Sequence, residues 1–204
     1  METVARLRNC SFMELVLTKE RMNFTMSPGK YTMTYASPVG KLTIAGGYDG
    51  ITGLWIENQK YFGGEQGFET QGNMPPVFEK TGEWLDLYFS GKEPDFIVPL
   101  HAKGSAFREA VWEILLTIPF GSVLTYGEIA KRLESTSGKR VSAQAVGGAV
   151  GHNPISILIP CHRVVGTNGS LTGYAGGIGK KVWLLTLEGA DMRHLFVPSK
   201  GTAL

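Results

Sequence analysis

The chain has 204 residues, of which 43% are hydrophobic and 19% are charged, a composition typical of a globular protein. No apolar run approaches the roughly 20 residues that a membrane-spanning helix needs. The apolar stretch at residues 12–17 is too short for the core of a signal peptide and contains Glu14. We therefore expect no membrane partner and a cytoplasmic location.

Charge is distributed unevenly along the chain. The formal net charge is +2, but residues 101–204 hold 11 Lys and Arg against 6 Asp and Glu, whereas residues 1–100 hold 9 against 12. A basic C-terminal half attracts phosphate groups. Many protein surfaces are equally asymmetric, so charge alone is weak support for nucleic-acid binding.

Residues 1–30 contain four methionines and show no sustained periodicity. We interpret them as an N-terminal extension that is either disordered or precedes the natural start of the chain. Cys10 lies in this extension, and the other cysteine is Cys161. Because neither belongs to a CxxC motif, a zinc ribbon or thioredoxin-like site is not expected. In a reducing compartment both are predicted to be free thiols.

Residues 31–95 predict a small α+β domain. A β-hairpin that turns at residues 37–40 is expected first, followed by a strand that ends at Ile56. A helix is expected from Pro75-Pro76 to Phe89, because its apolar residues fall near helical spacing. Nothing in this domain suggests chemistry, so we interpret it as a scaffold.

Residues 96–104 are predicted to be a linker, residues 105–190 a second and mostly helical domain, and residues 191–204 a C-terminal tail. The second domain begins with Ser105, which is placed to cap a helix with one apolar face. We expect the chain beyond Gly189 to be mobile, as chain ends generally are.

The next two predicted helices, residues 126–133 and 143–150, follow the capping residues Thr125 and Ser142. Together they are similar to a helix-turn-helix. The loop expected between them is longer than the usual three or four residues, so their spacing is poor support for that motif.

The second of these helices is rich in small residues, and each glycine weakens a helix by roughly 1 kcal/mol relative to alanine. One interpretation is close packing against a neighbouring helix. The other is close approach to a large surface such as a nucleic-acid groove. The small residues are Ala143, Ala145, Gly147, Gly148 and Ala149.

The apolar run at residues 155–159 predicts a buried strand, and Pro160-Cys161-His162 follows it. A cysteine is a strong nucleophile as the thiolate, and a neighbouring histidine is the usual base near neutral pH. Adjacent residues of a strand point to opposite faces, so Cys161 and His162 need an intervening turn or a water to communicate. The alternative is an inert thiol in the core.

The second domain carries a series of motifs over residues 105–189. In chain order they are Phe107, Val111-Trp112, Ile118-Pro119, Gly121, Thr125–Gly127, Ala145–Gly147, Asn153-Pro154, Pro160–Val164, Gly173–Gly177, Leu184-Leu185 and Glu188-Gly189. This series resembles the O6-alkylguanine-DNA alkyltransferases, also called methylated-DNA–protein-cysteine methyltransferases. The Pro-Cys-His-Arg-Val core is highly specific. Residues 31–95 match the family's companion domain only in general pattern.

The resemblance implies an α+β fold in two domains. The N-terminal one is a small unit of β-sheet and helix. The C-terminal one is mostly helical, contains a winged-helix-like helix-turn-helix, and presents the active-site cysteine on a strand or turn. The partner implied is double-stranded DNA containing O6-alkylguanine. The helix-turn-helix would bind through the minor groove, and the damaged base would be flipped out of the stack to reach the thiol.

The resemblance also implies the chemistry, which is DNA repair by direct transfer of an alkyl group from O6 of guanine, and in some members O4 of thymine. Cys161 would attack the alkyl carbon and keep the group. His162 would take the thiol proton through a water, and Glu188 would orient His162. Tyr126 would donate a hydrogen bond or proton to the leaving guanine, and Asn153 would hold the turn around the site. Because the thioether product is inert, the protein would act once.

Further residues are assigned by the same resemblance. Those expected at the DNA or in base flipping are Thr125, Ala143, Gln144, Ala145, Gly147, Gly148 and Arg163. Those expected in the substrate pocket are Trp112, Val164, Tyr174, Ala175 and Gly176. Taken alone, Trp112 favours a core position.

The sequence departs from the family pattern at Gln144, where the family usually has an arginine that fills the space left by the flipped base. Glutamine can still hydrogen-bond the orphaned base but brings no charge, which Lys139 or Arg140 would supply instead. A second departure concerns zinc, which some relatives carry. The four histidines are scattered and show no ligand spacing, so we expect no metal and no cofactor.

Two other functions are compatible with parts of the sequence. Some relatives bind alkylated DNA without an acceptor cysteine, and the presence of Cys161 argues against such a recognition module. A cysteine hydrolase would use Cys161, His162 and Glu188 as a triad and would turn over. We expect a monomer, because one reactive site suffices.

Overall fold

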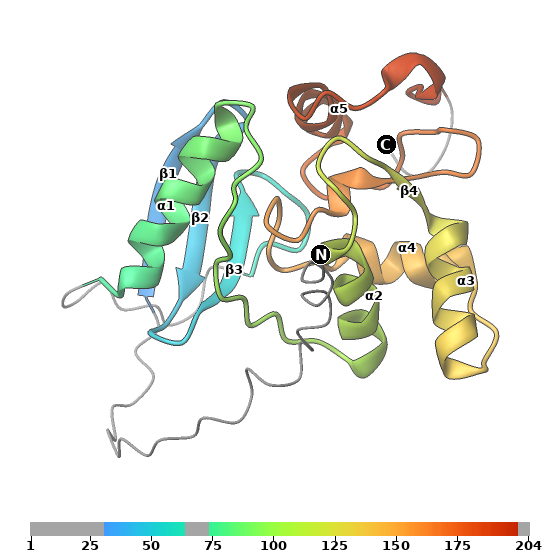
Figure 1. Ribbon diagram of the computed structural model, residues 1–204, viewed down its shortest axis with the longest axis horizontal. Coiled ribbons are helices and arrows are strands. Elements are labelled where there is room, and N and C mark those ends of the chain that lie inside the picture. The colour runs from blue at the N-terminus through green and yellow to red at the C-terminus, as the bar shows by residue number, and fades with distance from the viewer. Residues whose placement is uncertain (1–30, 64–73, 200–204) are drawn as a thin grey trace, which may run out of the picture.

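The computed structural model describes residues 31–63 and 74–199, and Figure 1 shows two domains side by side. The predicted extension at residues 1–30, with Cys10, lies outside the described residues. The N-terminal elements are β1 (Tyr31–Ser37), β2 (Gly40–Gly46), β3 (Ile51–Ile56) and α1 (Pro76–Phe89). The C-terminal elements are α2 (Ala106–Leu116), β4 (Leu124–Thr125), α3 (Tyr126–Ser137), α4 (Ala143–Gly151), β5 (Val164–Val165) and α5 (Ile178–Leu187).

The N-terminal domain is an antiparallel sheet in the order β1-β2-β3 with α1 across one face (Figure 1). The predicted hairpin is confirmed, and Gly40 closes its turn with φ +105°, a conformation that favours glycine. Helix α1 begins at Pro76, as predicted, and buries Phe78, Leu85 and Tyr88. Burial of these large side chains against the sheet holds the helix in place.

The edge of β3 that faces away from β2 joins the two domains through backbone hydrogen bonds. Near its start, Ile51 N donates to Pro99 O at 2.9 Å, so the linker pairs with the strand. Near its middle, Leu54 N donates to Pro154 O and Ser156 N donates to Leu54 O. Because these bonds involve main-chain atoms just before Cys161, the N-terminal sheet fixes the position of the segment that leads to the cysteine.

The three predicted caps in the C-terminal domain are confirmed. Ser105, Thr125 and Ser142 each accept a hydrogen bond from the backbone NH three residues ahead. Thr125 also forms a reciprocal capping box with Glu128. Helix α3 continues past the predicted end to Ser137, so the loop of the helix-turn-helix spans residues 138–142 and is shorter than expected.

The apolar segment before the cysteine corrects the predicted strand. Residues 155–159 form a turn with isolated bridges, and Cys161 begins a short 3-10 helix, Cys161–Arg163. Ile157 adopts φ +71° there while 1% exposed, which is strained for a β-branched residue. A short apolar run does not distinguish a strand from a buried turn, which explains the wrong prediction.

The end of the chain also differs from the sequence prediction. Helix α5 was not predicted, since its apolar face is interrupted by Lys181. Residues beyond Gly189 were expected to be mobile, yet Met192–His194 form a 3-10 helix and Leu171 N donates to Phe196 O at 2.8 Å. Within residues 31–63 and 74–199, no helix has the length and hydropathy to cross a membrane.

Candidate active site

Cys161 is 4% exposed and sits on the 3-10 helix between the β3 edge and α5. Asn153 ties the preceding turn together. Its Nδ2 donates to Ile159 O at 2.8 Å, and its Oδ1 accepts from Ile155 N at 3.0 Å. The buried amide thus spans the turn that precedes the thiol.

Glu188, the residue that caps the end of α5, gathers hydrogen bonds from several elements. Its Oε1 lies 2.7 Å from His162 Nε2 and 3.0 Å from Arg163 Nη2, and its Oε2 lies 2.8 Å from Arg163 Nε. Tyr88 Oη donates to the same Oε1 at 2.7 Å. All four side chains are buried, with His162 0% exposed. The Glu188 carboxylate can be buried because the Arg163 guanidinium balances its charge and because both of its oxygens accept hydrogen bonds.

The protonation states of this network follow from its geometry. Burial alone would raise the pKa of Glu188, but the hydrogen bonds from His162 and Arg163 and the charge of Arg163 outweigh it and hold the pKa at about 2. Burial lowers the pKa of His162 more than Glu188 raises it. His162 is therefore neutral near pH 7, with its proton on Nε2 facing the carboxylate. Its Nδ1 is buried and has no hydrogen-bond partner among the described residues, so that nitrogen keeps a lone pair able to accept a proton.

The thiol needs such a base. Burial raises the pKa of Cys161, although the Asn153 amide and the Lys181 ammonium act in the opposite direction. At neutral pH the sulfur is thus mainly protonated, and a proton acceptor must work at the moment of attack. The raised pKa of Cys161 and the lowered pKa of His162 keep both groups neutral in the resting site, so the thiol proton must leave as the sulfur attacks.

Lys181 is a site residue that sequence reasoning missed. It is 0% exposed, and its Nζ donates to Val164 O at 2.5 Å and to Thr172 O at 2.8 Å. Burial lowers its pKa to about 8, which the charge of Cys161 opposes. The ammonium ties β5 to the loop at Thr172. The available signal was a lysine on the apolar face of a helix, at helical spacing from Leu184 and Leu185.

Two tyrosines flank the thiol from the C-terminal domain. Tyr126, at the start of α3, donates from its hydroxyl to Thr172 O at 3.1 Å, and burial raises its pKa to about 12, with the Cys161 charge adding to the shift. It therefore keeps its proton and can donate. Tyr174 is 7% exposed with a buried hydroxyl. A Cβ on Gly173 would lie 2.9 Å from Tyr126 Oη, and its φ is +69°, so this loop position requires glycine.

The loop that carries Tyr174 is held from both domains. Ala175 O accepts a hydrogen bond from Lys60 N at 3.0 Å, which is a contact from the N-terminal domain. A Cβ on Gly176 would lie 2.8 Å from the Tyr174 ring. Tyr174, Ala175 and Gly176 therefore lie on a loop that is fixed by contacts with both domains.

Three of the residues expected at the DNA or in the substrate pocket are buried inside the protein. Arg163 was assigned to DNA, but its guanidinium donates hydrogen bonds inside the protein to Glu188 and to Ile118 O. The buried carboxylate of Glu188 requires this positive charge. Trp112, assigned to the pocket, is 3% exposed in the core, where its Nε1 donates to Ala149 O of α4 at 3.0 Å. Val164 is 0% exposed and pairs with Leu124 between β5 and β4.

Helix α4 presents a smooth outer face. Its inner side buries Val146, Ala149 and Val150, whereas the N-terminal part of its outer side is exposed. An added Cβ at Gly148 would meet nothing within 4 Å, which indicates open space above the helix. Gly147 faces the Tyr126 ring, 3.8 Å from an added Cβ. The exposed residues are Ala143, Gln144, Ala145 and Gly148.

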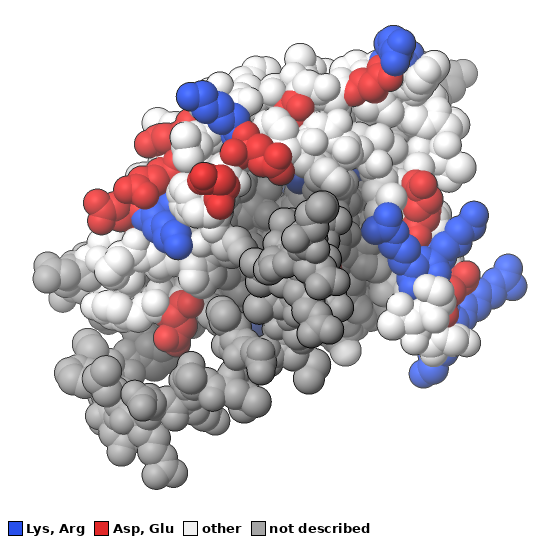
Figure 2. All heavy atoms as spheres, viewed as in Figure 1, with Lys and Arg blue, Asp and Glu red and all other residues white. Residues whose placement is uncertain are grey.

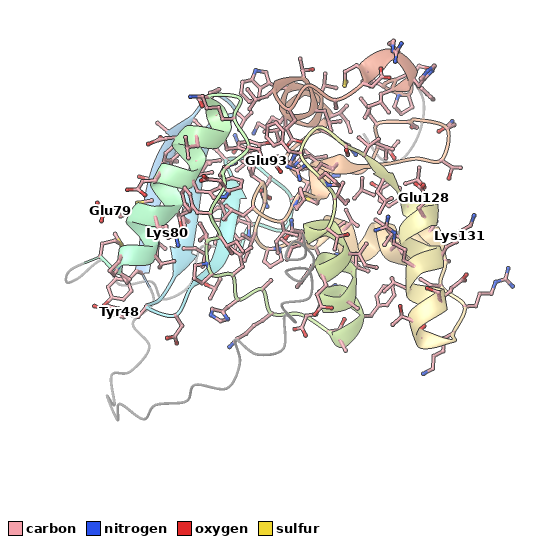
Figure 3. All side chains as sticks on the ribbon, in the orientation of Figure 1. Tyr48, Glu79, Lys80, Glu93, Glu128 and Lys131 are labelled. Atoms are coloured by element: carbon pink, nitrogen blue, oxygen red, sulfur yellow. The ribbon has the colours of Figure 1, made fainter. Side chains whose placement is uncertain are left out.

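Basic side chains gather beside this helix-turn-helix. Figure 2 shows Lys and Arg clustered on the α3 side of the molecule, whereas both signs mix over the N-terminal domain. The exposed basic residues of this region are Lys131, Arg132, Lys139 and Arg140. Lys131 projects outward from α3, with Glu128 near the start of the same helix (Figure 3). Thr125, expected at the DNA, uses its hydroxyl in the Glu128 capping box.

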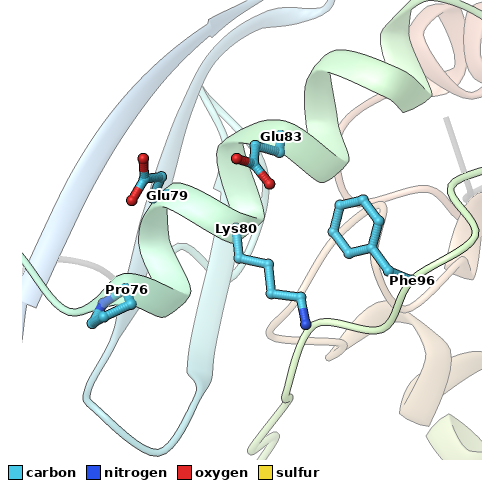
Figure 4. A pocket seen from close by; sticks show the side chains of 5 residues that line it. All are labelled: Pro76, Glu79, Lys80, Glu83 and Phe96. Carbon is cyan, nitrogen blue, oxygen red and sulfur yellow. The ribbon is translucent and has the colours of Figure 1, made fainter.

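A hollow of about 350 Å³ lies apart from this chemistry, between α1 and the linker. Lys80 reaches over the Phe96 ring there, with Glu79 and Glu83 on the helix above (Figure 4). None of the residues that line it belongs to the Cys161 network. Across the described parts of the chain, no three His, Cys, Asp or Glu side chains group as metal ligands.

Comparisons with known proteins cover both domains. Residues 106–190 match the protein family described as "6-O-methylguanine DNA methyltransferase, DNA binding domain". Residues 30–102 match the protein family described as "6-O-methylguanine DNA methyltransferase, ribonuclease-like domain".

Individual relatives agree with the family descriptions. A methylated-DNA–protein-cysteine methyltransferase of Mycolicibacterium paratuberculosis is 43% identical over 76% of this chain and 90% of its own length. The protein of the same name from Haemophilus influenzae is 42% identical over 78% of this chain and 86% of its own. The crystal structure of Mycobacterium tuberculosis OGT in complex with DNA superposes with a TM-score of 0.70 at 42% identity, covering 78% of this chain and 93% of that one.

The site combines a buried cysteine with a histidine–glutamate pair, and it lies next to a helix-turn-helix whose second helix has an exposed face. These features are typical of a DNA-binding protein with a cysteine nucleophile. With both domains matched and relatives above 40% identity, the chain belongs to the family of methylated-DNA–protein-cysteine methyltransferases.

Proposed function

We propose that this protein repairs DNA by moving a methyl or larger alkyl group from O6 of guanine to Cys161. The observation that carries the proposal is the arrangement of the thiol, a neutral His162 and an ionised Glu188 in one buried site. In the transfer, a bond forms between Cys161 Sγ and the alkyl carbon as the bond from that carbon to O6 breaks. The thiol proton passes through a water to His162 Nδ1.

The roles of the neighbouring residues follow from their positions. Tyr126 keeps its proton and would donate a hydrogen bond to the departing guanine, which gains negative charge as the bond to O6 breaks. Asn153 would keep the turn in shape while the sulfur changes charge. Tyr174, Ala175 and Gly176 would line the space for the alkylated base. The substrate would be double-stranded DNA carrying O6-alkylguanine, and the protein would act as a monomer without metal.

The DNA would meet the exposed face of α4. A base buried in the stack cannot reach a thiol that is 4% exposed, so it must be flipped out of the duplex. Small side chains at Ala143, Ala145 and Gly148 permit close approach to the minor groove. The basic residues beside α3 would contact phosphates.

Stoichiometry tests the proposal. An oligonucleotide duplex containing O6-methylguanine is titrated into a fixed amount of protein, and intact mass and repaired base are measured together. We expect one methyl per protein and one equivalent of guanine, because no group in the site is suited to break the thioether. Binding without any mass gain would instead support an alkylated-DNA recognition module, and many equivalents consumed would support a hydrolase. A duplex with unmodified guanine is the control.

A first prediction concerns the exposed Gln144 on α4. Gln144→Arg is expected to raise affinity for undamaged duplex about 3- to 10-fold at low salt, because it adds one charge near the phosphates. The gain should shrink as salt rises, since the charge releases counterions on binding. Duplex-binding titrations at two salt concentrations measure it. Equal affinity of parent and variant at low salt would show that Gln144 does not approach the DNA.

A further inference from the structure

A tyrosine of the N-terminal domain contacts the buried His162–Glu188 pair. Tyr88, on α1, is 0% exposed. Its hydroxyl donates to Glu188 Oε1 at 2.7 Å and lies 3.3 Å from His162 Nε2. The sequence placed Tyr88 in the apolar face of a scaffold helix, and nothing in the expected roles of the site included it.

The hydroxyl is held rigidly where it is. The Tyr88 ring stacks on Trp84 with centroids 5.3 Å apart, and Phe120 meets its edge at 6.0 Å. Burial raises the pKa of Tyr88 far above its ordinary value, and the negative charge of Glu188 adds to that shift. The group is therefore a permanent donor. Its orientation toward Glu188 is fixed by packing against Trp84 of α1 and Phe120 of the C-terminal domain.

The bonds to Glu188 show what this donor contributes. Oε1 accepts from Tyr88, His162 and Arg163, and Oε2 accepts from Arg163 and, at 3.3 Å, from Gly121 N. We propose that Tyr88 is a positioning residue of the alkyl-transfer site, supplied by the N-terminal domain, whose hydroxyl fixes Glu188 and limits its pull on the proton of His162. This inference rests on the function proposed above.

The physical effect is on the basicity of the carboxylate. Each donor spreads the charge of a carboxylate and lowers its affinity for a further proton. Without the Tyr88 hydroxyl, Glu188 would present more charge to His162 and stabilise the imidazolium, so the pKa of His162 would rise. The other charged or titratable groups that face His162 are Arg163 and Cys161 on its own segment, Lys181 on α5 and Tyr174 on the neighbouring loop.

Tyr88→Phe tests the proposal, because it removes only the hydroxyl and keeps the ring in its stack. The pKa of His162 is read by NMR titration of ring-labelled histidine, and the single-turnover rate is measured against pH with the O6-methylguanine duplex. We expect the pKa of His162 and the acid limb of the rate profile to move up together by about half a unit. On the acid limb the rate should fall by about threefold, because a half-unit rise in the pKa leaves about threefold less of His162 in the neutral form there.

Tyr35→Phe is the matched control. Tyr35 also donates to a carboxylate of α1, Asp86 Oδ1 at 2.6 Å, but on the outer side of the N-terminal domain. This variant should leave the pKa of His162 and the acid limb where they are. If Tyr88→Phe lowers the rate equally at every pH with no change in the pKa of His162, the hydroxyl is merely structural and the proposal is wrong. If the parent transfers no alkyl group while the pKa still shifts, the proposed function fails and the hydrogen-bond role stands.

Discussion

Cys161→Ser is expected to abolish alkyl transfer while the protein still binds duplex DNA. A hydroxyl loses its proton far less readily than a thiol, and oxygen attacks an alkyl carbon more weakly than sulfur does. The loss should be on the order of 10⁴-fold or more, comparable to removing the nucleophile of other covalent catalysts. Because α4 and the basic residues beside α3 are unchanged, affinity for the O6-methylguanine duplex should stay within about threefold of the parent.

The substitution also has a small cost in stability. Cys161 is 4% exposed among apolar neighbours, and a hydroxyl placed there without a good partner costs about 1–3 kcal/mol. Thermal unfolding should therefore show a cooperative but earlier transition. Intact mass after incubation with substrate, and a binding titration on the same preparation, give the two readouts. A methyl group that still appears on the serine variant would place the acceptor at another residue and contradict the mechanism.

Local signals in the sequence predicted much of the fold. The hairpin of β1 and β2 follows from a Ser-Pro-Val-Gly turn between the two strands, and the helices after Ser105, Thr125 and Ser142 follow from their caps. These features depend on neighbouring residues, whose chemistry is visible along the chain. The turn that includes Ile157 could not be predicted, because its left-handed backbone is imposed by burial and by bonds from Asn153.

The site shows the same division. Cys161 and His162 were found from adjacent residue types, and Glu188 entered through the family resemblance. Arg163 was assigned to DNA through the same resemblance, yet it neutralises Glu188. Tyr88 was taken for an ordinary core residue, since a contact with a residue 100 positions away leaves no local pattern. Buried polar pairing across domains is therefore the part of the site that needed the structure.

Glu188→Gln is expected to have the largest effect on stability. Glutamine keeps the shape and can still accept from His162, but it leaves the buried Arg163 guanidinium without its counter-charge. Breaking a buried pair from one side costs about 3–5 kcal/mol. Transfer should slow by about 10²-fold, because the imidazolium that forms at His162 loses the adjacent negative charge. Glu113→Gln on the exposed side of α2 is the matched control and should change neither quantity measurably.

The pH dependence separates this electrostatic effect from a packing defect. The folded-state pKa of Glu188, about 2, lies below its ordinary value of 4.5, so its contribution is fully present above pH 4.5 and is lost as pH falls toward 2. That contribution is about 3 kcal/mol. Urea unfolding at pH 7, 4 and 3 should therefore show the parent and Glu188→Gln converging as the pH falls. A difference of constant size would mean that the variant is destabilised by altered packing, and that the buried charge of Glu188 does not support the fold.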